Sequence, residues 1–320
     1  MRSTRKEKVS KPLPPVRVGI SRCLLGDAVR YDGGHKRDTF LVDVLGSVVD
    51  WVSVCPEVEA GMTTPREPIR LVGNARSPRL MAVKSGKDLT QMMSSFSARR
   101  VAELEASELS GYVFKKDSPS CGVERVRVVN HQGIPARNGI GVFAKVFMEH
   151  FPLIPVEEEG RLRDPVLRDN FIERVFSYHR WRALMLGPVS RSAVVEFHTT
   201  HKYALLAHSR DHYQALGHLT AQSNRYRPRD LLERYGEIFM EALKIKATVR
   251  KHVNVLHHLV SHFKSRLSSV ERSELDAVIA DYHRGLVPLV VPLTLVKHYV
   301  TMYDIAYIHN QVYLNPYPRS

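Results

Sequence analysis

The sequence predicts a two-domain protein: an α/β domain with a mostly parallel, layered sheet over residues 16–156, followed by an all-α helical bundle over residues 157–320. From residue 16 onward, short apolar runs alternate with stretches of helical spacing. Prolines and an acidic run in FPLIPVEEEGRLRDP, residues 151–165, interrupt this alternation. Beyond that point the apolar residues recur almost entirely at helical spacing.

Each element of the α/β domain is expected from a local pattern. Residues 1–15 are basic, poor in apolar residues and rich in proline at their end, which predicts a flexible arm. Strands are expected at 16–21 (VRVGIS), 51–54 (WVSV) and 111–116 (GYVFKK), with a possible edge strand at 79–83 (RLMAV). Helices are expected at 39–50 (TFLVDVLGSVVD) and 89–109 (LTQMMSSFSARRVAELEASEL).

The second domain is expected to contain six or seven helices. In residues 247–267, apolar side chains recur at steps of three and four and so share one helical face: Val249, Val253, Leu256, Val260 and Phe263. Residues 168–181, 228–245, 269–283 and 293–308 show similar spacing. These faces are expected to form the core of the bundle.

Composition narrows the class of protein. The formal net charge of +14 and the pI near 9.8 favour an acidic partner, nucleic acid first, although surplus Lys and Arg can also serve solubility alone. Three cysteines and no apolar leader argue against a secreted, disulfide-bonded protein. A cytoplasmic protein is therefore expected. No run of eighteen apolar residues is present, so we expect no membrane span. The sequence gives no sign of an obligate protein partner.

The three cysteines all follow expected strands. Cys23 comes after VRVGISR, Cys55 directly after WVSV, and Cys121 soon after GYVFKK. Loops at the carboxyl ends of parallel strands meet at one edge of the sheet, so these thiols are expected to share a metal site. The alternative is that they are buried and act as small hydrophobic side chains.

The strings around these cysteines resemble the signature loops of the thiouracil and thiouridine desulfidases. They are SRCLLGDAVRYDGGHK, VCPEVEAGMTTPREPIRL and KKDSPSCGVERV. The second half, through strings such as LLAHSRDHYQALGHL and KHVNVLHHLVSHFK, is similar to the helical domain fused to this module in the longer, RNA-directed members. The resemblance runs from residue 16 to about residue 318.

This resemblance implies a 4Fe–4S cluster held by only three thiolates, those of Cys23, Cys55 and Cys121. One iron then lacks a protein ligand and is open to the sulfur of a substrate, since iron–sulfur clusters ordinarily take four cysteines and this chain has three. Zinc held by three thiolates and a water is the competing interpretation.

Replacing C=S by C=O needs an acid/base group near the metal. Glu57, two residues after Cys55, is the best-placed carboxylate, and the resemblance points to it as well. The alternative is an ion pair of Glu57 with Arg66 or Arg30. The resemblance also suggests that Ser118 assists catalysis, but the sequence does not distinguish it from Ser120, and loop serines often bind nearby backbone instead.

Charged residues of the same loops are candidate contacts to the base or its phosphates. They are Arg30, Asp32 and Lys116, with Ser120 as a further substrate contact, and each is equally able to orient the loops. Compared with the short family members, this chain has Arg before Cys23, and in REPIRL it lacks the carboxylate that often follows the proline. We expect Arg66 and Arg70 to make the mouth of the pocket basic, which suits a substrate that bears phosphate.

Two strings in the helical domain interleave arginine with aromatic rings. SYHRWR and SNRYRPR supply candidate RNA contacts at Arg180, Arg182, Arg225, Tyr226, Arg227 and Arg229. The alternative is that Trp181 belongs to the core and the arginines form a solvated face. Thirteen of the sixteen histidines follow residue 160, but no accompanying Cys or Glu pattern indicates a metal site there.

The sequence therefore predicts a cluster-dependent, non-redox desulfidase that converts 4-thiouridine in tRNA to uridine and hydrosulfide. Two alternatives stay open. One is the same chemistry on free thiouracil or thiouridine nucleotides, and the other is a non-catalytic RNA-binding or redox-sensing iron–sulfur protein.

Overall fold

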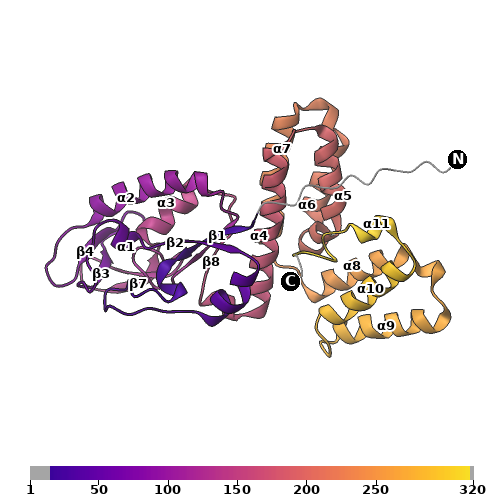
Figure 1. The fold of residues 1–320 in the computed structure, drawn as a ribbon, viewed down its shortest axis with the longest axis horizontal. Helices are drawn as coiled ribbons and strands as arrows, with labels where there is room; N and C mark the ends of the chain where they lie inside the picture. The colour runs from indigo at the N-terminus through magenta and orange to yellow at the C-terminus, as the bar shows by residue number, and fades with distance from the viewer. Residues whose placement is uncertain (1–14, 318–320) are drawn as a thin grey trace.

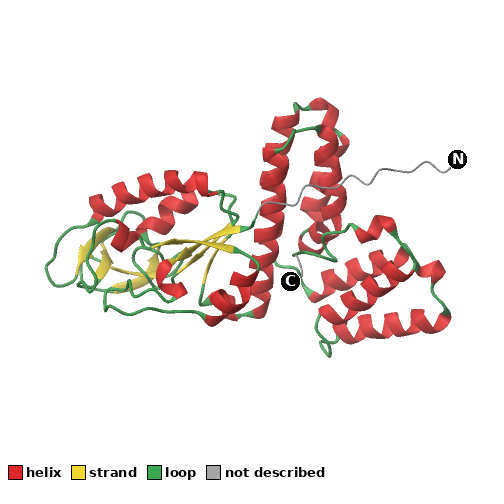
Figure 2. Ribbon diagram, viewed as in Figure 1, coloured by secondary structure: helices red, strands yellow, loops and turns green. Residues whose placement is uncertain are grey.

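The computed structural model describes residues 15–317, and its two parts are an α/β domain and a helical domain (Figures 1 and 2). The α/β domain holds a four-stranded sheet in the order β2-β1-β5-β8, in which every neighbouring pair is parallel. Its strands are β1 (Arg17–Ser21), β2 (Asp50–Val54), β5 (Gly111–Phe114) and β8 (Val156–Glu158). The predicted fold class is confirmed. Residues 1–14 of the predicted arm lie outside the described residues.

A second four-stranded sheet has the order β4-β3-β6-β7. It consists of β3 (Ile69–Val72), β4 (Arg79–Ala82), β6 (Val126–Val129) and β7 (Pro135–Gly139). The pair β3–β6 is parallel, and the two outer pairs are antiparallel. The predicted edge strand at 79–83 is β4, but the other three strands of this sheet were not predicted.

Three α-helices lie within the α/β domain: α1 (Pro56–Glu59), α2 (Thr90–Glu103) and α3 (Val142–His150). The rings of Tyr112, Phe114, Phe143 and Phe147 pack together between the parallel sheet and α3, with the Tyr112 and Phe114 centroids 4.0 Å apart. Gly19 is required beside this cluster, because a Cβ at Gly19 would lie 2.1 Å from the Tyr112 ring.

The helix predicted at 39–50 is wrong in type and length. The segment forms a π-helix at Phe40–Val44 and then a 3-10 turn at Leu45–Ser47. Its β-branched valines and Gly46 are weak helix formers. A Cβ added at Gly46 would lie 3.2 Å from the carbonyl oxygen of Leu41, so the turn is tight there. The helix predicted at 89–109 is α2, which ends at Glu103 and continues as a 3-10 turn to Ser107.

The described part of the helical domain has eight α-helices, one or two more than predicted. They are α4 (Pro165–Leu186), α5 (Arg191–His208), α6 (Arg210–Ala221), α7 (Pro228–Lys244), α8 (Val249–Ser261), α9 (Ser269–His283), α10 (Val290–Met302) and α11 (Ala306–His309). Side-chain caps from Asp164, Ser190, Ser209 and Ser268 begin α4, α5, α6 and α9. None of the described helices combines the length and the apolar character needed to cross a bilayer.

Helix α4 connects the two domains, and Figure 1 shows it standing between them. Phe171, Val175 and Phe176 belong to the same core as strands β1 and β5. Farther along the helix, Trp181 belongs to the core of α5–α7 and packs against Gly236. The predicted boundary between residues 156 and 157 falls inside strand β8, which is an edge strand of the parallel sheet. Residues 157 and 158 therefore belong to the α/β domain.

Candidate functional site

Three loops at the carboxyl ends of parallel strands meet around one cavity of about 420 Å³. Cys23 lies in the 3-10 turn Arg22–Leu25 that follows β1, and Cys55 lies between β2 and α1. Cys121 lies in the loop between β5 and β6. All three thiols line the cavity, as does Glu57. The convergence expected from the strand ends is therefore present, while metal binding by these thiols stays a prediction.

Local hydrogen bonds hold two of the cysteine loops. The backbone N–H of Cys55 donates to Glu59 Oε1 at 2.8 Å. Ser118 Oγ accepts the N–H groups of Ser120 and Cys121 at 3.2 and 3.1 Å, which closes the turn that carries Cys121. Only glycine fits at Gly141, since a Cβ there would lie 2.5 Å from the Ser120 backbone. The thiols are therefore presented by braced backbone.

The thiols share a poorly solvated environment. Burial, with a smaller contribution from Cys55, raises the pKa of Cys23 to about 11, while Lys115 and Arg30 act in the opposite direction. Burial also raises the pKa of Cys55 and places that of Cys121 well above its ordinary value. Without a bound cation these thiols are therefore protonated near neutral pH, so binding a metal releases protons.

The donor set fits an iron–sulfur cluster. Thiolates are the usual cluster ligands, and three of them come from three different loops. Arg30, Lys115 and Lys116 line the same cavity and offset the negative charge that thiolates and sulfides bring. Among residues 15–317, no group of three His, Cys, Asp or Glu side chains is arranged to hold a single metal ion.

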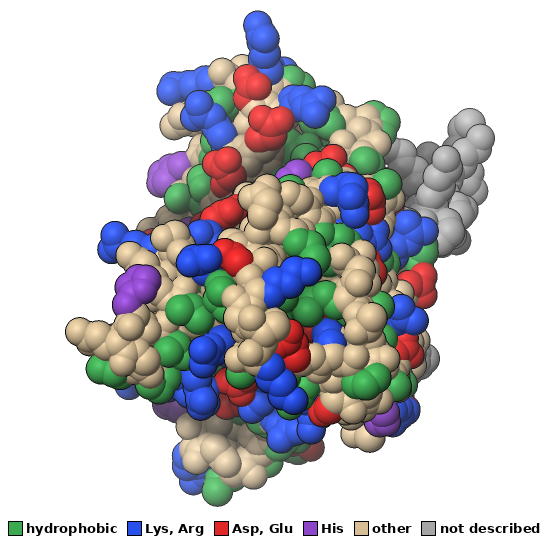
Figure 3. Space-filling view, turned by 90° about the vertical axis from the view of Figure 1, so that its left-hand side faces the viewer, with side chains coloured by type: hydrophobic (Ala, Val, Ile, Leu, Met, Phe, Trp, Pro, Cys, Tyr) green, Lys and Arg blue, Asp and Glu red, His purple; other side chains and the backbone are tan. Residues whose placement is uncertain are grey.

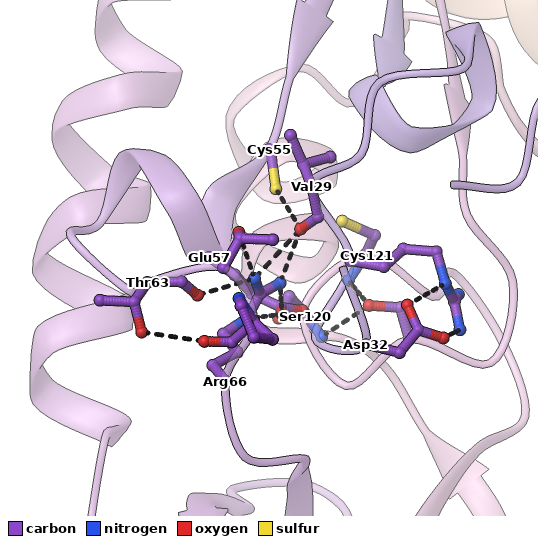
Figure 4. A network of polar contacts seen from close by, with 12 residues as sticks. Val29, Asp32, Cys55, Glu57, Thr63, Arg66, Ser120 and Cys121 are labelled. Carbon is purple, nitrogen blue, oxygen red and sulfur yellow. Dashed lines mark hydrogen bonds and ion pairs between the residues drawn. The ribbon is translucent and has the colours of Figure 1, made fainter. Parts of the chain in front are cut away.

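Glu57 and Arg66 form a buried ion pair beside the thiols (Figure 4). Arg66 Nε donates to Glu57 Oε2 at 2.9 Å, and Arg66 Nη2 makes a second, shorter contact to the same oxygen. The other oxygen, Oε1, accepts the hydroxyl of Ser120 at 2.8 Å. The ion pair with Arg66 that we considered as an alternative for Glu57 is therefore present, and Glu57 also faces the cavity.

Arg66 was expected to make the pocket mouth basic, and it does line the cavity, but its guanidinium is paired with Glu57. Its side chain is only 6% exposed, and Nη1 and Nη2 both donate to the carbonyl of Val29, at 3.0 and 3.1 Å. Nη1 also reaches Thr63 O and Thr64 Oγ1, each at 3.2 Å. Since its donors are used within the protein, Arg66 joins the Cys23 and Cys55 loops. Arg70 is exposed on strand β3.

The two candidate serines have different positions. Ser118 lines the cavity, whereas Ser120 is fully buried and donates to Glu57. Ser120 therefore orients Glu57 from behind and has no surface left for the substrate contact that we predicted. Ser118 accepts two backbone N–H groups and retains its own proton for donation.

The predicted charged contacts divide in the same way. Arg30 and Lys116 line the cavity. Asp32 accepts from Arg30 at 3.2 Å and from the Gly34 N–H at 3.0 Å, so it orients Arg30 and the glycine loop. The hydrogen bond from Arg30, followed by that from the Gly34 backbone, lowers the pKa of Asp32.

Sequence reasoning missed four polar residues of the site: Ser21, Lys115, Glu158 and Glu159. Ser21 is buried, lines the cavity and hydrogen-bonds the Cys121 thiol, and its Oγ accepts the Lys115 N–H at 2.9 Å. Glu159 accepts from Lys115 Nζ at 2.5 Å and from the Lys116 N–H at 2.7 Å. Glu158 accepts from the Val123 N–H at 2.8 Å, beyond Cys121. The acidic run of residues 157–159 was the available signal, but it was used only to mark a domain boundary.

The two predicted RNA-binding strings also differ from each other. Arg180 Nη2 donates to the carbonyls of Asn315 and Pro316, and Arg182 donates to Glu108 at 2.9 Å. These two arginines are therefore committed to internal contacts, and Trp181 is core, as its alternative interpretation held. In the second string, Arg225, Arg227 and Arg229 are exposed. Tyr226 is half-buried, with the Arg234 guanidinium over its ring.

Figure 3 shows the end of the molecule that the α/β domain forms. Lys and Arg side chains are spread over this face and are interspersed with Asp and Glu, so its positive charge does not gather into one patch.

The fold and the site together define a two-domain protein whose α/β part presents three thiols and a carboxylate on one cavity. Residues 18–159 match the 2-thiouracil desulfurase family, and residues 202–318 match the family described as protein of unknown function (DUF1722). The chain thus belongs to the 2-thiouracil desulfurase family and carries a C-terminal DUF1722 domain.

Two curated proteins are similar to this chain. Uncharacterized protein YbgA of Escherichia coli (strain K12) is 33% identical over 152 residues, which cover 47% of this chain and 90% of that protein. Uncharacterized protein YbbK of Bacillus subtilis (strain 168) is 32% identical over 111 residues, which cover 32% of this chain and 71% of that protein. Among solved structures, the 4Fe-4S-dependent thiouracil desulfidase TudS (DUF523Vcz) is 29% identical, with a TM-score of 0.39 over 48% of this chain and 97% of that one.

Proposed function

We propose that this protein is an iron–sulfur-dependent, non-redox desulfidase that converts 4-thiouridine in tRNA to uridine and hydrosulfide. The observation that carries the proposal is the convergence of three thiols and Glu57 on one cavity. Membership of the 2-thiouracil desulfurase family supports the chemistry. The reaction balances without an electron donor, because C=S and water give C=O and hydrogen sulfide, which loses a proton to become hydrosulfide.

Cys23, Cys55 and Cys121 would hold a 4Fe–4S cluster. The similar protein TudS is named as a 4Fe–4S-dependent enzyme. When bound, a cluster with one iron free of protein ligands supplies a soft site for the thiocarbonyl sulfur and for the departing hydrosulfide. Thiolates on a cluster bind different irons, whereas zinc would require all three thiolates on one ion. Metal and sulfide analysis therefore separates the two.

Glu57 is the group that moves the proton. Its ion pair with Arg66 is formed by the ionised carboxylate, which is the form that accepts a proton from an attacking water. Ser120 and Arg66 fix the two oxygens from the protein side and so set the direction from which water is reached. Ser118 lines the cavity and would donate to the oxygen or ring nitrogen of the base.

Charge supports the proposal of tRNA rather than a free base as the substrate. The chain carries a net charge of +14, and Arg30, Lys36 and Lys116 line the cavity. Arg225, Arg227 and Arg229 add exposed positive charge in the helical domain, where they lie between α6 and α7 or at the start of α7. Backbone phosphates are the common partner of such groups.

The proposal is tested by measuring sulfide release from 4-thiouridine-containing tRNA and from free 2-thiouracil, using protein reconstituted anaerobically with iron and sulfide. We expect turnover of the tRNA, with an apparent affinity that falls steeply as salt rises. Cys55→Ala is expected to abolish turnover and to lose iron, whereas Glu57→Gln keeps its iron and turns over about 10²–10⁴-fold more slowly.

The matched control is Glu103→Gln, which removes an exposed carboxylate on α2 and is expected to leave both readouts unchanged. Full turnover by Cys55→Ala would refute the cluster assignment. Tight tRNA binding without any sulfide release would favour a non-catalytic RNA-binding protein, and faster turnover of 2-thiouracil than of tRNA would reassign the substrate to a free base.

A further inference from the structure

The helical domain contains a second cavity, of about 670 Å³, on the side of α4 that faces α8 and α10. Its size is within the range typical of small-molecule sites. The walls come from the first turns of α4, from α8, α9 and α10, and from the C-terminal segment at residues 313–317. Arg180 holds this segment through the carbonyls of Asn315 and Pro316, so the last wall is tied to α4.

The floor of this cavity contains buried polar groups. Glu173 Oε2 lies 3.0 Å from His208 Nε2, with side-chain exposures of 20% and 2%. His252 Nδ1 lies 2.8 Å from the Tyr313 hydroxyl. Burial lowers the pKa of His252 to about 4, so this imidazole is neutral at neutral pH. Glu173 lines the cavity and is 20% exposed, and His208 occupies only its Oε2. Its other carboxylate oxygen is therefore available as an acceptor for a ligand.

The remaining lining residues separate into apolar walls and charged groups. Val249, Leu289, Leu293 and Leu314 supply aliphatic surface, and Tyr282, Tyr313 and Tyr317 supply rings. Lys246 is exposed and Lys297 is half-buried, while Asp169 is the only carboxylate besides Glu173 among the described lining residues. A ligand that fits this set has a flat apolar body, a donor that reaches Glu173, and an anionic group for the lysines.

We propose that this cavity binds a nucleotide, with the base against the tyrosines, an exocyclic amino group donated to Glu173, and the phosphate at Lys246 and Lys297. Bases stack on aromatic rings, and carboxylates accept from amino groups of bases. An aliphatic acid would contact the lysines and walls but would leave the second oxygen of Glu173, the one not paired with His208, without a donor. The nucleotide is either free in solution or an unpaired nucleotide of a bound RNA. Only this choice of source rests on the proposed function.

Isothermal titration of the full-length protein with the four nucleoside monophosphates tests the proposal. The amino-bearing AMP, CMP and GMP are expected to bind about tenfold more tightly than UMP, whose base offers no amino group. Lys246→Ala is expected to weaken nucleotides by about tenfold and to leave the matching nucleosides unaffected. Lys244→Ala is the control, because Lys244 is exposed and pairs with Glu241 away from the cavity.

Thr294→Trp is a second variant that places a large ring at an exposed lining position, and we expect it to abolish binding without unfolding α10. Equal affinity for UMP and the amino-bearing nucleotides, tighter binding of decanoate than of any nucleotide, or unchanged binding by Thr294→Trp would each overturn the proposal. If RNA supplies the nucleotide, Thr294→Trp also weakens tRNA binding; if the nucleotide is free, tRNA binding is unchanged. Sulfide release from 4-thiouridine-containing tRNA by the wild type reports the proposed function separately.

Discussion

Replacing Arg66 by alanine tests whether this residue is a structural link between two cysteine loops. Its guanidinium donates to Glu57, Val29 and Thr63, with its side chain 6% exposed. Removal leaves the Glu57 carboxylate buried without its cation, a change that costs about 3–5 kcal/mol for buried pairs. At about 2–4 °C per kcal/mol for domains of this size, the melting temperature should fall by about 6–20 °C.

The assay is thermal unfolding followed by circular dichroism on the metal-free, full-length protein. Arg66→Lys keeps the charge but loses the planar fork, so we expect an intermediate fall in melting temperature. The double variant with Glu57→Gln should be destabilised by less than the sum of the two single variants, because the unpaired carboxylate is then absent. Arg70→Ala, on an exposed position of β3, is the matched control and should change stability by less than about 0.5 kcal/mol.

Two results would contradict this reasoning. The first is a melting temperature of Arg66→Ala within about 1 °C of the wild type, which is far below the effect of a lost buried pair. The second is strict additivity in the double variant, which would mean that Glu57 and Arg66 do not interact. An unchanged melting temperature together with weaker tRNA binding would restore Arg66 as a phosphate contact.

Three further outcomes are expected. Ser120→Ala removes the hydrogen bond to Glu57 Oε1 and should lower kcat by about fivefold to tenfold in the sulfide assay, so an unchanged kcat would disprove its orienting role. Burial acts to raise the pKa of Glu173 and to lower that of His208, but their mutual charge reverses both shifts, so Glu173 is lowered from 4.5 and His208 is raised from 6.5. The stabilisation from Glu173 is complete above pH 4.5 and is lost on acidification, and that from His208 is complete below pH 6.5 and is lost as pH rises. The difference in melting temperature between wild type and His208→Gln should therefore be largest between pH 4.5 and pH 6.5. Finally, chelating iron from the reconstituted protein should abolish sulfide release, and iron with sulfide should restore it; activity that survives chelation would argue against the cluster.

The thiol site was predictable because it follows from local signals. A parallel strand is recognised from its own apolar run, and the rule that ligands collect at carboxyl strand ends then brings Cys23, Cys55 and Cys121 together. Glu57 was found because it stands two residues from Cys55 on the same braced turn. In each case the candidate residue lies within a few positions of the element that places it.

The supporting contacts were not predictable because they join residues far apart in the chain. Arg66 was expected at the mouth of the pocket or paired with Glu57, but its contact with Val29, 37 positions earlier, was not expected. Arg182 looked like an RNA contact from its neighbours, but its partner is Glu108, 74 positions earlier. A local pattern of alternating arginine and aromatic residues is the same whether the helix faces solvent or a second domain, so periodicity alone does not separate the two.

The acidic run at the end of β8 explains how the two domains depend on each other. Glu158 and Glu159 are both buried and accept backbone N–H groups on either side of Cys121, at Val123 and Lys116. Two residues farther on, Arg161 binds Glu124 at 2.6 Å, and α4 begins at Pro165. The loop that carries one thiol is therefore bonded to the segment that starts the helical domain. Because α4 also shares an apolar core with β1 and β5, a displacement of the helical domain would have to break these bonds or that core. The position of the helical domain is thus fixed relative to the thiols, and an RNA bound to its exposed arginines would approach the cavity from a set direction.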